Sequence, residues 1–309
     1  MIITSTPLRL SLLGGNTDFP AYFKKYGGAV LTTTIDKYIY CIVNKRFDDQ
    51  IWVNYSEKEI VEYVDDIKHD IVREALNLVG IEKGVEITFL SDVPSEGSGL
   101  GSSSAVTVGL LNALHNFKGE SVTNKQLAEE ACKIEIDILK KPIGVQDQYA
   151  VAYGGFNLFK FGKEVEIKPL VSRYLPEKLL LLYTGKNRDA NKILSKMRLK
   201  KKILDKNKRL AILGAMMVDH DEAIGVFMHE YWELKRKLNK HVTNGVLDRL
   251  YEEARDAGAT GGKIVGAGGG GFFLFHVPIE KRGIVKRALQ LKELPFRFTK
   301  YGSRVIFNI

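Results

Sequence analysis

Pro94-Ser95-Glu96-Gly97-Ser98-Gly99-Leu100-Gly101-Ser102-Ser103-Ser104-Ala105 is the stretch around which the sequence is organised. It follows a run of alternating apolar residues, 85–90, that predicts a strand. It precedes a segment rich in Ala, Leu and Val, 105–114, that predicts a helix. A glycine–serine loop at a helix N-terminus offers free backbone N–H groups and the positive end of the helix dipole to an anion. We therefore predict that this loop binds phosphate, with serine hydroxyls able to cap the helix, bind the phosphate or hold a metal.

A flexible turn ending in an ordinary serine N-cap explains the same composition about equally well. The stretch does not match the common nucleotide-binding patterns. The pattern G-x-x-x-x-G-K-S/T occurs nowhere in the chain, and no G-x-G-x-x-G follows the predicted strand. Gly97, Gly99 and Gly101 nevertheless allow backbone conformations and close approaches that a Cβ would block. The residues of the loop alone leave both interpretations open.

The whole chain has the composition of a soluble globular protein, with 309 residues, 45% of them hydrophobic and 27% charged. Its net charge of +9 is compatible with nucleic acid, anionic lipid or phosphorylated small molecules as partners. The excess is concentrated in residues 196–209, which contain no interleaved aromatic residues and no nucleic-acid motif. A solvated helix face explains this cluster best, so we expect no nucleic-acid partner.

Cysteine content and apolar patterning indicate the expected compartment. Two cysteines, Cys41 and Cys132, cannot build a disulfide framework and suit a reducing environment. The N-terminus lacks a basic region before a long apolar core, and apolar runs such as 179–183 are too short to span a bilayer. These features predict a cytoplasmic protein without a membrane partner.

The first residues contain a buried-looking arginine. Arg9 lies among apolar residues in a segment, 2–13, that predicts strands, and a guanidinium there needs an anionic partner. The loop that follows, 14–18, ends in Asp18. One interpretation pairs Arg9 with a buried carboxylate and makes Asp18 the cap of a helix around Tyr22; the other gives both residues a role in a binding site.

Several further elements follow from periodicity and capping signals. Residues 27–35 and 38–43 predict paired β segments, 51–55 another strand, and 70–79 a helix that ends at Gly80. Thr123 opens a capping-box pattern for a helix whose apolar stripe lies close to Glu135.

Two carboxylates in this part of the chain have both a structural and a functional interpretation. Glu135 could pair with Lys133 or Lys140, and Asp147, in an apolar loop after Pro142, could cap a helix.

The second half of the sequence predicts a separate domain. Residues 179–184 predict its first central strand, which places the boundary near 165–175 and gives domains 1–170 and 171–309. Two or three helices are expected in 190–257, including an apolar stripe of core residues: Phe227, Tyr231, Leu234 and Leu238. A last helix near 280–291 and strands at 295–307 are expected to complete this domain.

Two loops of the second half have unusual compositions. Lys186, Arg188 and Lys192 lie in a loop that enters a helix, which indicates either solvated charge or a phosphate site. Between predicted strands, residues 266–271 contain five glycines, more than a hairpin turn requires. We expect this glycine run to pack tightly against another part of the backbone.

Three motifs resemble those of the GHMP kinases, the family of galacto-, homoserine, mevalonate and phosphomevalonate kinases. Residues 94–105 resemble its second motif, P-x-x-x-G-L-G/S-S-S-A/S, and residues 7–18 resemble the first. Residues 263–271 resemble the third, K-x-S/T-G-A-G-G-G-G, with Val265 where a Ser or Thr is frequent. The motifs occur in family order and cover the chain from residue 7 to 275.

This resemblance implies an α+β fold of two domains, with mixed or antiparallel sheets, helices, and an active site in the interdomain cleft. It also implies ATP and Mg²⁺ as cofactors and a monomer or homodimer. By resemblance, Asp147 is the catalytic base and Arg9 stabilises developing charge, while Ser104 (or Ser103) and Glu135 hold the metal. ATP would contact Pro94, Gly97, Ser98, Gly99, Leu100, Gly101, Ser102, Ser103 and Ser104. The substrate would contact Asp18, Gly14, Gly15, Thr17, Lys186, Arg188, Gly268 and Gly269.

Within the family, Gly15-Asn16 and the segment Tyr183-Thr184-Gly185 with Arg188 look most like the branch acting on D-glycero-D-manno-heptose 7-phosphate. That branch phosphorylates the anomeric hydroxyl to give the 1,7-bisphosphate, on the way to nucleotide-activated heptose. A fucokinase- or galactokinase-like sugar 1-kinase is the alternative within the family. A sugar or nucleotide sensor that has lost catalysis is the alternative from another functional class; the presence of both Glu135 and Asp147 favours an enzyme.

Overall fold

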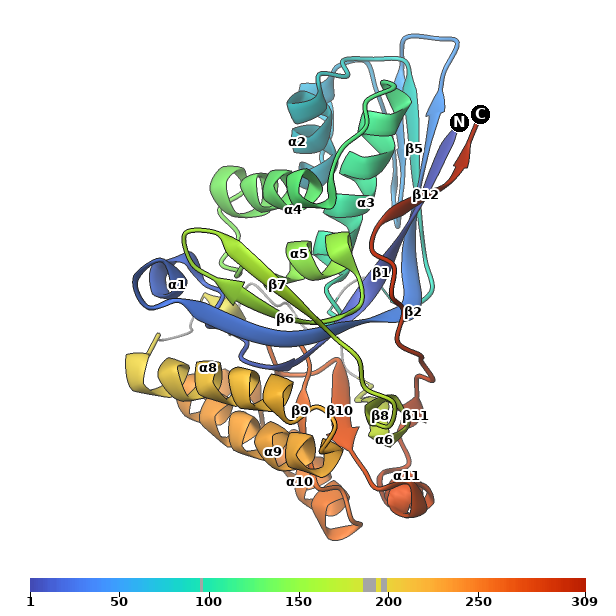
Figure 1. Cartoon of the computed structure of the whole chain (residues 1–309). Helices are drawn as coiled ribbons and strands as arrows, with labels where there is room; N and C mark the ends of the chain where they lie inside the picture. The colour runs from blue at the N-terminus through green and yellow to red at the C-terminus, as the bar shows by residue number, and fades with distance from the viewer. Residues whose placement is uncertain (95–96, 186–192, 196–198) are drawn as a thin grey trace.

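The computed structural model describes residues 1–94, 97–185, 193–195 and 199–309. These residues form an α+β structure with an eight-stranded mixed sheet and a four-stranded antiparallel sheet (Figure 1), which confirms the predicted fold class. Within the described chain, no helix has the length and apolar character needed to cross a bilayer. Cys41 and Cys132 are both free.

The strands divide between the two sheets. The larger sheet contains β1 (Ile2–Leu13), β2 (Gly28–Lys45), β3 (Ile51–Asn54), β4 (Lys58–Val61), β5 (Val85–Ser91), β6 (Phe156–Phe161), β7 (Val165–Leu170) and β12 (Arg304–Asn308). The smaller sheet has the order β11 (Lys292–Glu293), β8 (Leu179–Tyr183), β10 (Phe272–His276) and β9 (Gly261–Ile264). Along the chain, the first sheet therefore gives way to the second between β7 and β8.

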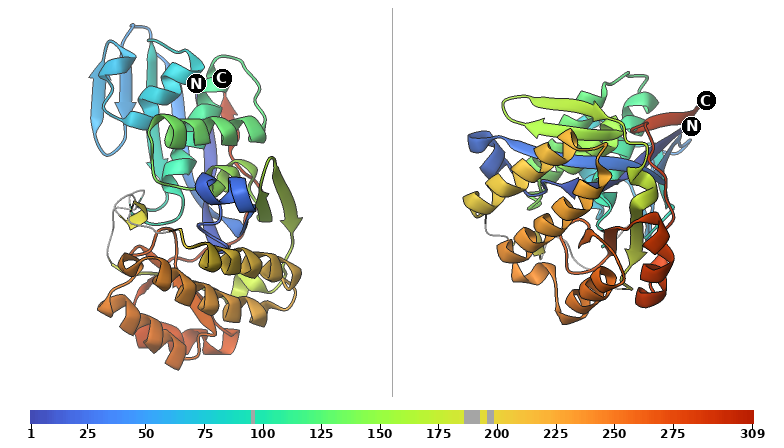
Figure 2. Two further views of the ribbon diagram at one scale, coloured as in Figure 1. Left: turned by 90° about the vertical axis from the view of Figure 1, so that its left-hand side faces the viewer. Right: turned by 60° about the horizontal axis from the view of Figure 1, so that its bottom comes forward.

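The helices pack around these sheets as Figures 1 and 2 show. They are α1 (Pro20–Tyr26), α2 (Asp70–Val79), α3 (Ser102–Phe117), α4 (Asn124–Cys132), α5 (Gln146–Tyr153), α6 (Leu175–Lys178), α8 (Lys201–Met216), α9 (Asp221–Leu238), α10 (Gly245–Asp256) and α11 (Arg282–Leu289). A π-helical segment, Lys133–Ile138, continues α4. The helices α8, α9 and α10 confirm the expectation of two or three helices in 190–257.

Strand β2 corrects the prediction of two paired segments at 27–35 and 38–43. Residues 28–45 form one strand that pairs antiparallel with β1 over almost its whole length. Its first half also pairs with β6 and its second half with β5. Pro7, which cannot donate to a ladder, lies where the β1–β2 register shifts, so the strand continues past it.

The C-terminal strand belongs to the first sheet and not, as expected, to the second half of the molecule. β12 pairs antiparallel with β1, with Ile3 opposite Phe307, and the two chain ends lie side by side (Figure 1). The segment leading to β12 is held by backbone hydrogen bonds, including those from Thr299 N to Thr34 O and from Ser303 N to Val151 O. A strand is therefore present near the end of the predicted range 295–307, but the expectation that it completes the second half of the molecule is wrong, because the edge of β1 binds the returning chain.

Three apolar clusters fill the space between the described elements. The largest contains the inward faces of β1, β2 and α3, and the second packs α9 and α10 on β10 through Trp232, Tyr251, Phe273 and Phe275. The smallest contains Tyr22, Leu204 and Leu238. Tyr231, Leu234 and Leu238 of the predicted stripe are buried, as expected for core residues. Tyr231 in addition lines a cavity described below.

Gly154 offers a test of how the returning segment is attached. It has φ +70° and ψ 178°, a region that other residues enter only with strain, and a Cβ there would lie 2.1 Å from the Tyr301 carbonyl carbon. We expect Gly154→Ala to lower the free energy of unfolding by about 3 kcal/mol or more, since steric overlap adds to about 1–3 kcal/mol of backbone strain.

Urea denaturation of the variant and wild type measures this difference. Gly245→Ala is the matched control, because Gly245 has open space around it at the start of α10 and should change stability by less than about 1 kcal/mol. Equal stabilities for wild type and Gly154→Ala would show that the attachment of the returning segment does not depend on the close contact between Gly154 and Tyr301.

Candidate active site

The predicted phosphate loop leads directly into α3. Gly97, Gly99 and Gly101 all have positive φ, and Gly101, at +78°, is the N-cap of the helix. The first turn of α3 therefore presents N–H groups that have no partner within the helix. A Cβ on Gly101 would lie 2.9 Å from the Arg9 side chain, so only glycine allows the loop and the arginine to lie together. Pro94, at the start of the loop, is exposed.

The glycine run packs against this loop, as expected. A Cβ on Gly271 would lie 2.5 Å from Ser98 O and 2.9 Å from Gly97 O. Gly268 and Gly269, predicted to bind substrate, lie against Val242, and Gly269 N donates to Val242 O. The residues of the run that line the cavities are Gly266 and Ala267.

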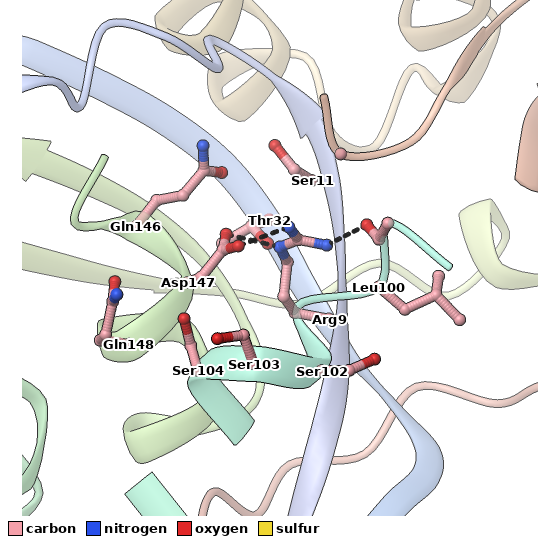
Figure 3. Close-up of polar contacts among 12 residues, drawn as sticks. Arg9, Ser11, Thr32, Leu100, Ser102, Ser103, Ser104, Gln146, Asp147 and Gln148 are labelled. Carbon is pink, nitrogen blue, oxygen red and sulfur yellow. Dashed lines mark hydrogen bonds and ion pairs between the residues drawn. The ribbon is translucent and has the colours of Figure 1, made fainter. Parts of the chain in front are cut away.

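An ion pair joins strand β1 to helix α5 at the centre of the site (Figure 3). Arg9, only 4% exposed, donates from Nε to Asp147 Oδ1 at 2.7 Å and from Nη2 to Oδ2 at 2.6 Å. Its Nη1 donates to Gly99 O at 2.6 Å, and its backbone N donates to Leu100 O. Asp147 is thus the buried arginine's anionic partner, and the pair ties β1, the phosphate loop and α5 together.

Two cavities meet at this ion pair. We call the first the phosphate cavity; it is lined by the loop from Gly97 to Ser104 together with Glu135 and Lys141. We call the second the acceptor cavity; it is lined by Ser11, Gly15, Asn16, Asp18, Gln146, Tyr231 and Lys263, among others. Both cavities are lined by Arg9, Asp147, Ile143, Leu194, Gly266 and Ala267. In Figure 3, Ser11 and Gln146 lie on one side of the ion pair and the three serines on the other.

Glu135 is completely buried behind the phosphate loop. Its carboxylate accepts hydrogen bonds from Ser103, from Ser104 at 2.8 Å and from Gln148 at 2.7 Å. Among the described residues, the Glu135 carboxylate is therefore hydrogen-bonded to these three side chains and forms no ion pair with Lys133 or Lys140. Burial raises the pKa of Glu135, whereas Lys141 and the hydrogen bonds lower it.

Magnesium fits this set of donors. Mg²⁺ in nucleotide sites uses one or two carboxylates and completes its octahedral shell with phosphate and water oxygens. Glu135 supplies one carboxylate and Ser103 and Ser104 supply hydroxyl oxygens beside the phosphate loop. Within the described part of the chain, no group of three or more His, Cys, Asp or Glu side chains is placed to hold a metal ion.

Asp18 faces the acceptor cavity and does not cap α1, whose N-cap is Phe19. It is 1% exposed; its Oδ2 accepts from Gln146 N at 3.2 Å, and its Oδ1 has no hydrogen-bond partner. Burial, and secondly the negative charge of Asp147, raise the pKa of Asp18 to about 6. Among the other residues predicted to bind substrate, Gly15 lines the cavity, whereas Gly14 and Thr17 form the turn that precedes Asp18. Lys186 and Arg188, like Lys192, lie outside the described residues.

Several residues of the acceptor cavity were not selected from the sequence. Ser11 Oγ, Asn16 Nδ2 and Gln146 Oε1 are buried without a hydrogen-bond partner in the described structure, as is Asp18 Oδ1. Ser11 could have been found, because it is two residues from Arg9 and side chains alternate along a strand. Gln146 directly precedes Asp147, but no sequence signal shows that its amide oxygen would lack a partner.

Lys263 was also missed, although it begins the third motif. It is 1% exposed, and its Nζ donates to Ser11 O at 2.7 Å and to Leu12 O at 3.3 Å. Burial, together with the positive charge of Arg9, lowers the pKa of Lys263 to about 7. It thereby connects β9 of the second sheet to β1 of the first beside the acceptor cavity.

Comparison with known proteins gives consistent matches over the chain. A family model described as the GHMP kinases N-terminal domain matches residues 53–155. D-glycero-alpha-D-manno-heptose 7-phosphate kinase of Campylobacter jejuni is 35% identical, over 98% of each chain. A crystal structure of a D-glycero-D-manno-heptose 1-phosphate kinase from Bacteroides thetaiotaomicron is similar with a TM-score of 0.82 and 26% identity, covering 100% of this chain and 99% of that one. A putative sugar kinase of Campylobacter jejuni has a TM-score of 0.79 and 32% identity, covering 98% and 97%.

The raised pKa of Asp18 predicts a pH-dependent gain in stability for Asp18→Asn. In the folded protein the pKa of Asp18 is about 6, above its ordinary value of 3.8. The contribution of Asp18 to the free energy of unfolding is therefore most favourable below pH 3.8 and is lost as the pH rises through 6. At pH 7.5 the ionised carboxylate destabilises the fold, so Asp18→Asn should be more stable by up to about 3 kcal/mol. Oδ1 of the amide can still accept from Gln146 N.

Urea denaturation at pH 7.5 and at pH 5 measures this effect. The gain should shrink at the lower pH, since the wild-type carboxyl is then mostly protonated in the folded state. A gain in stability that is the same at both pH values, or a loss of stability at pH 7.5, would contradict a raised pKa for Asp18.

Proposed function

The chain belongs to the GHMP kinase family, and from that premise we propose that it phosphorylates the anomeric hydroxyl of D-glycero-D-manno-heptose 7-phosphate with ATP. The observation that carries the proposal is the acceptor cavity, whose lining residues include four buried polar atoms that have no hydrogen-bond partner in the described structure. Asp147 lines both this cavity and the phosphate cavity. The 35% identity to a heptose 7-phosphate kinase over nearly the whole chain supports this choice of sugar.

The unpartnered atoms favour a polyhydroxylated acceptor. A buried polar group without a hydrogen bond is unfavourable by about 1–3 kcal/mol, so such groups collected in a cavity indicate a ligand that satisfies them. Asp18 Oδ1 and Gln146 Oε1 accept hydrogen bonds, Asn16 Nδ2 donates them, and Ser11 Oγ can do either. Sugar hydroxyls both donate and accept, and therefore match this mixture, whereas an apolar ligand would leave all four atoms unpaired.

The proposed reaction needs positioning and charge stabilisation more than covalent chemistry. N–H groups of the phosphate loop and the first turn of α3 would hold the ATP phosphates. Glu135 with Ser104 (or Ser103) would hold Mg²⁺, which supplies neutralisation of phosphate charge when bound. The acceptor hydroxyl, held by Asp18 and its neighbours, would then face the transferred phosphoryl group across the Arg9–Asp147 pair.

Asp147 retains the capacity to accept a proton in this arrangement. Each of its oxygens takes one hydrogen bond from Arg9, and a carboxylate oxygen can accept two. The remaining acceptor positions are available to the sugar hydroxyl, because a quarter of the Asp147 side chain is exposed. Arg9 fixes the orientation of the carboxylate and brings a positive charge to the place where the two cavities meet.

A panel of acceptors tests the proposed substrate. We expect heptose 7-phosphate to have a kcat/KM at least about 100-fold above those of unphosphorylated heptose, mannose, fucose, galactose and mevalonate, because missing polar contacts reduce transition-state binding strongly. ADP release gives the rates, and phosphorus NMR of the product identifies the position of the new phosphate. Equal turnover of a free sugar would exclude the heptose phosphate and leave a GHMP sugar kinase of other specificity.

Asp147→Asn tests the proposed base. We expect kcat to fall about 10²–10⁴-fold, the usual contribution of a general base, while ATP affinity measured by calorimetry stays within about twofold. Asp137→Asn, a change to an exposed carboxylate on the preceding segment, should leave both quantities unchanged. If Asp147→Asn retains more than about a tenth of the wild-type kcat, Asp147 is not the general base.

A further inference from the structure

An unusual backbone path brings Lys141 back towards Glu135. The helix widens into a π-helix over Lys133–Ile138, where Leu139 N donates to Ile134 O, five residues earlier. Lys140 then takes a positive φ of 52°, and Lys141 N donates to Glu135 O at 2.9 Å. Single π-helical turns are rare and often occur at functional sites. Here the turn places Lys141 at the wall of the phosphate cavity.

Lys141 differs from the other charged groups of that cavity in its partners. Arg9 is hydrogen-bonded to both oxygens of Asp147 and to Gly99 O, and Glu135 accepts three hydrogen bonds. The Nζ of Lys141 has one ion-pair partner in the described chain, Asp70 Oδ2 at 3.7 Å. That distance is too long for a hydrogen bond, and the Asp70 side chain is 47% exposed, so the pair is weak.

Negative charge in the phosphate cavity favours a cation at the position of Lys141. The Arg9–Asp147 pair is neutral overall, so the remaining ionised group in the described lining of the cavity, apart from Lys141, is the Glu135 carboxylate. A triphosphate would add further negative charge directly beside it. A lysine ammonium, a compact charge with three donors, is a common phosphate ligand.

We propose that Lys141 is a phosphate-binding residue that contacts the outer phosphates of the nucleotide. The inference rests on the proposed function, because it takes the ligand of this cavity to be ATP. It assigns to Lys141 the role that a loop lysine has in other nucleotide sites, although the lysine here comes from the π-helical turn and not from the phosphate loop. With the side chain only 16% exposed, its donors are available mainly to a ligand within the cavity.

A purely structural role for Lys141 makes a different prediction. If its charge serves only to neutralise Asp70 and Glu135, then Asp70→Asn and Lys141→Met should both disturb this region, and both should weaken nucleotide binding through it. If Lys141 binds phosphate, Asp70→Asn releases the ammonium from its weak partner. That variant should then bind ATP as tightly as wild type or more tightly.

The test is calorimetric titration of ATP and of adenosine, with EDTA and then with Mg²⁺, so that binding is measured without turnover. Lys141→Met keeps most of the aliphatic stem and removes the charge. We expect it to weaken ATP binding by at least about tenfold, the loss of a charge-assisted contact, and to leave adenosine binding unchanged. The loss should be greater in EDTA, where the metal does not share the neutralisation of the phosphates. Lys141→Arg should retain most of the affinity, and Lys133→Met, an exposed lysine on the same segment, is the matched control.

The outcomes separate the inference from the function on which it rests. Unchanged ATP affinity in Lys141→Met overturns the phosphate-binding role, as does an equal loss for ATP and adenosine. Should Lys141→Met fail to fold, weaker ATP binding by Asp70→Asn than by wild type overturns that role, and equal or tighter binding supports it. A wild-type protein that binds neither ATP nor adenosine overturns the proposed kinase function, and this inference with it.

Discussion

The bidentate ion pair between Arg9 and Asp147 is the interaction on which the site depends. Arg9 is buried in β1, and a buried guanidinium is tolerated only when its donors are satisfied. The structure satisfies them from two separate elements, since α5 supplies Asp147 and the phosphate loop supplies Gly99 O. The relative positions of the loop, the start of α5 and strand β1 are therefore fixed by one side chain. Because both cavities include the pair in their walls, under the proposed function the same contact would set the distance between the phosphate donor and the acceptor.

The polar groups that line the acceptor cavity reduce the stability of the free protein. Burial and the nearby Asp147 disfavour the charge of Asp18 and raise its pKa to about 6, and in the described structure Ser11, Asn16 and Gln146 each have a buried atom without a hydrogen-bond partner. Such groups are unfavourable in the free protein and become favourable only when a ligand completes their hydrogen bonds. Under the proposed function, a sugar bound in the cavity would supply the missing hydrogen bonds, which an apolar group of the same size could not.

Local chemistry in the sequence predicted the parts of the site that depend on short segments. The glycine–serine loop between a strand and a helix, the need of Arg9 for an anionic partner and the tight packing of the glycine run all follow from a few neighbouring residues. Phosphate binding by the loop stays a prediction. The resemblance to the family then selected Glu135 and Asp147. What the sequence could not show depends on how distant segments meet: the continuity of β2, the pairing of β12 with β1, and the convergence of Ser11, Asn16, Gln146 and Lys263 on one cavity. Gly266, Ala267, Gly268 and Gly269 all belong to the recognisable motif. Gly266 and Ala267 line the cavity, whereas the run then turns away and packs on Val242.

Lys263 shows how a local irregularity in one sheet is used to attach the other. The β1–β2 register shifts between Ser11 and Leu13, so that β1 carries one extra residue, Leu12, relative to its partner. Such a bulge interrupts the ladder and leaves buried carbonyl groups that must find other donors. Lys263 reaches from β9 to Ser11 O and Leu12 O, a distance between sheets that a shorter polar side chain would not cross. Its amine can donate to both carbonyls whether or not it carries a charge, which is compatible with its pKa near 7. The second sheet is thereby attached to the strand that carries Arg9, beside the acceptor cavity.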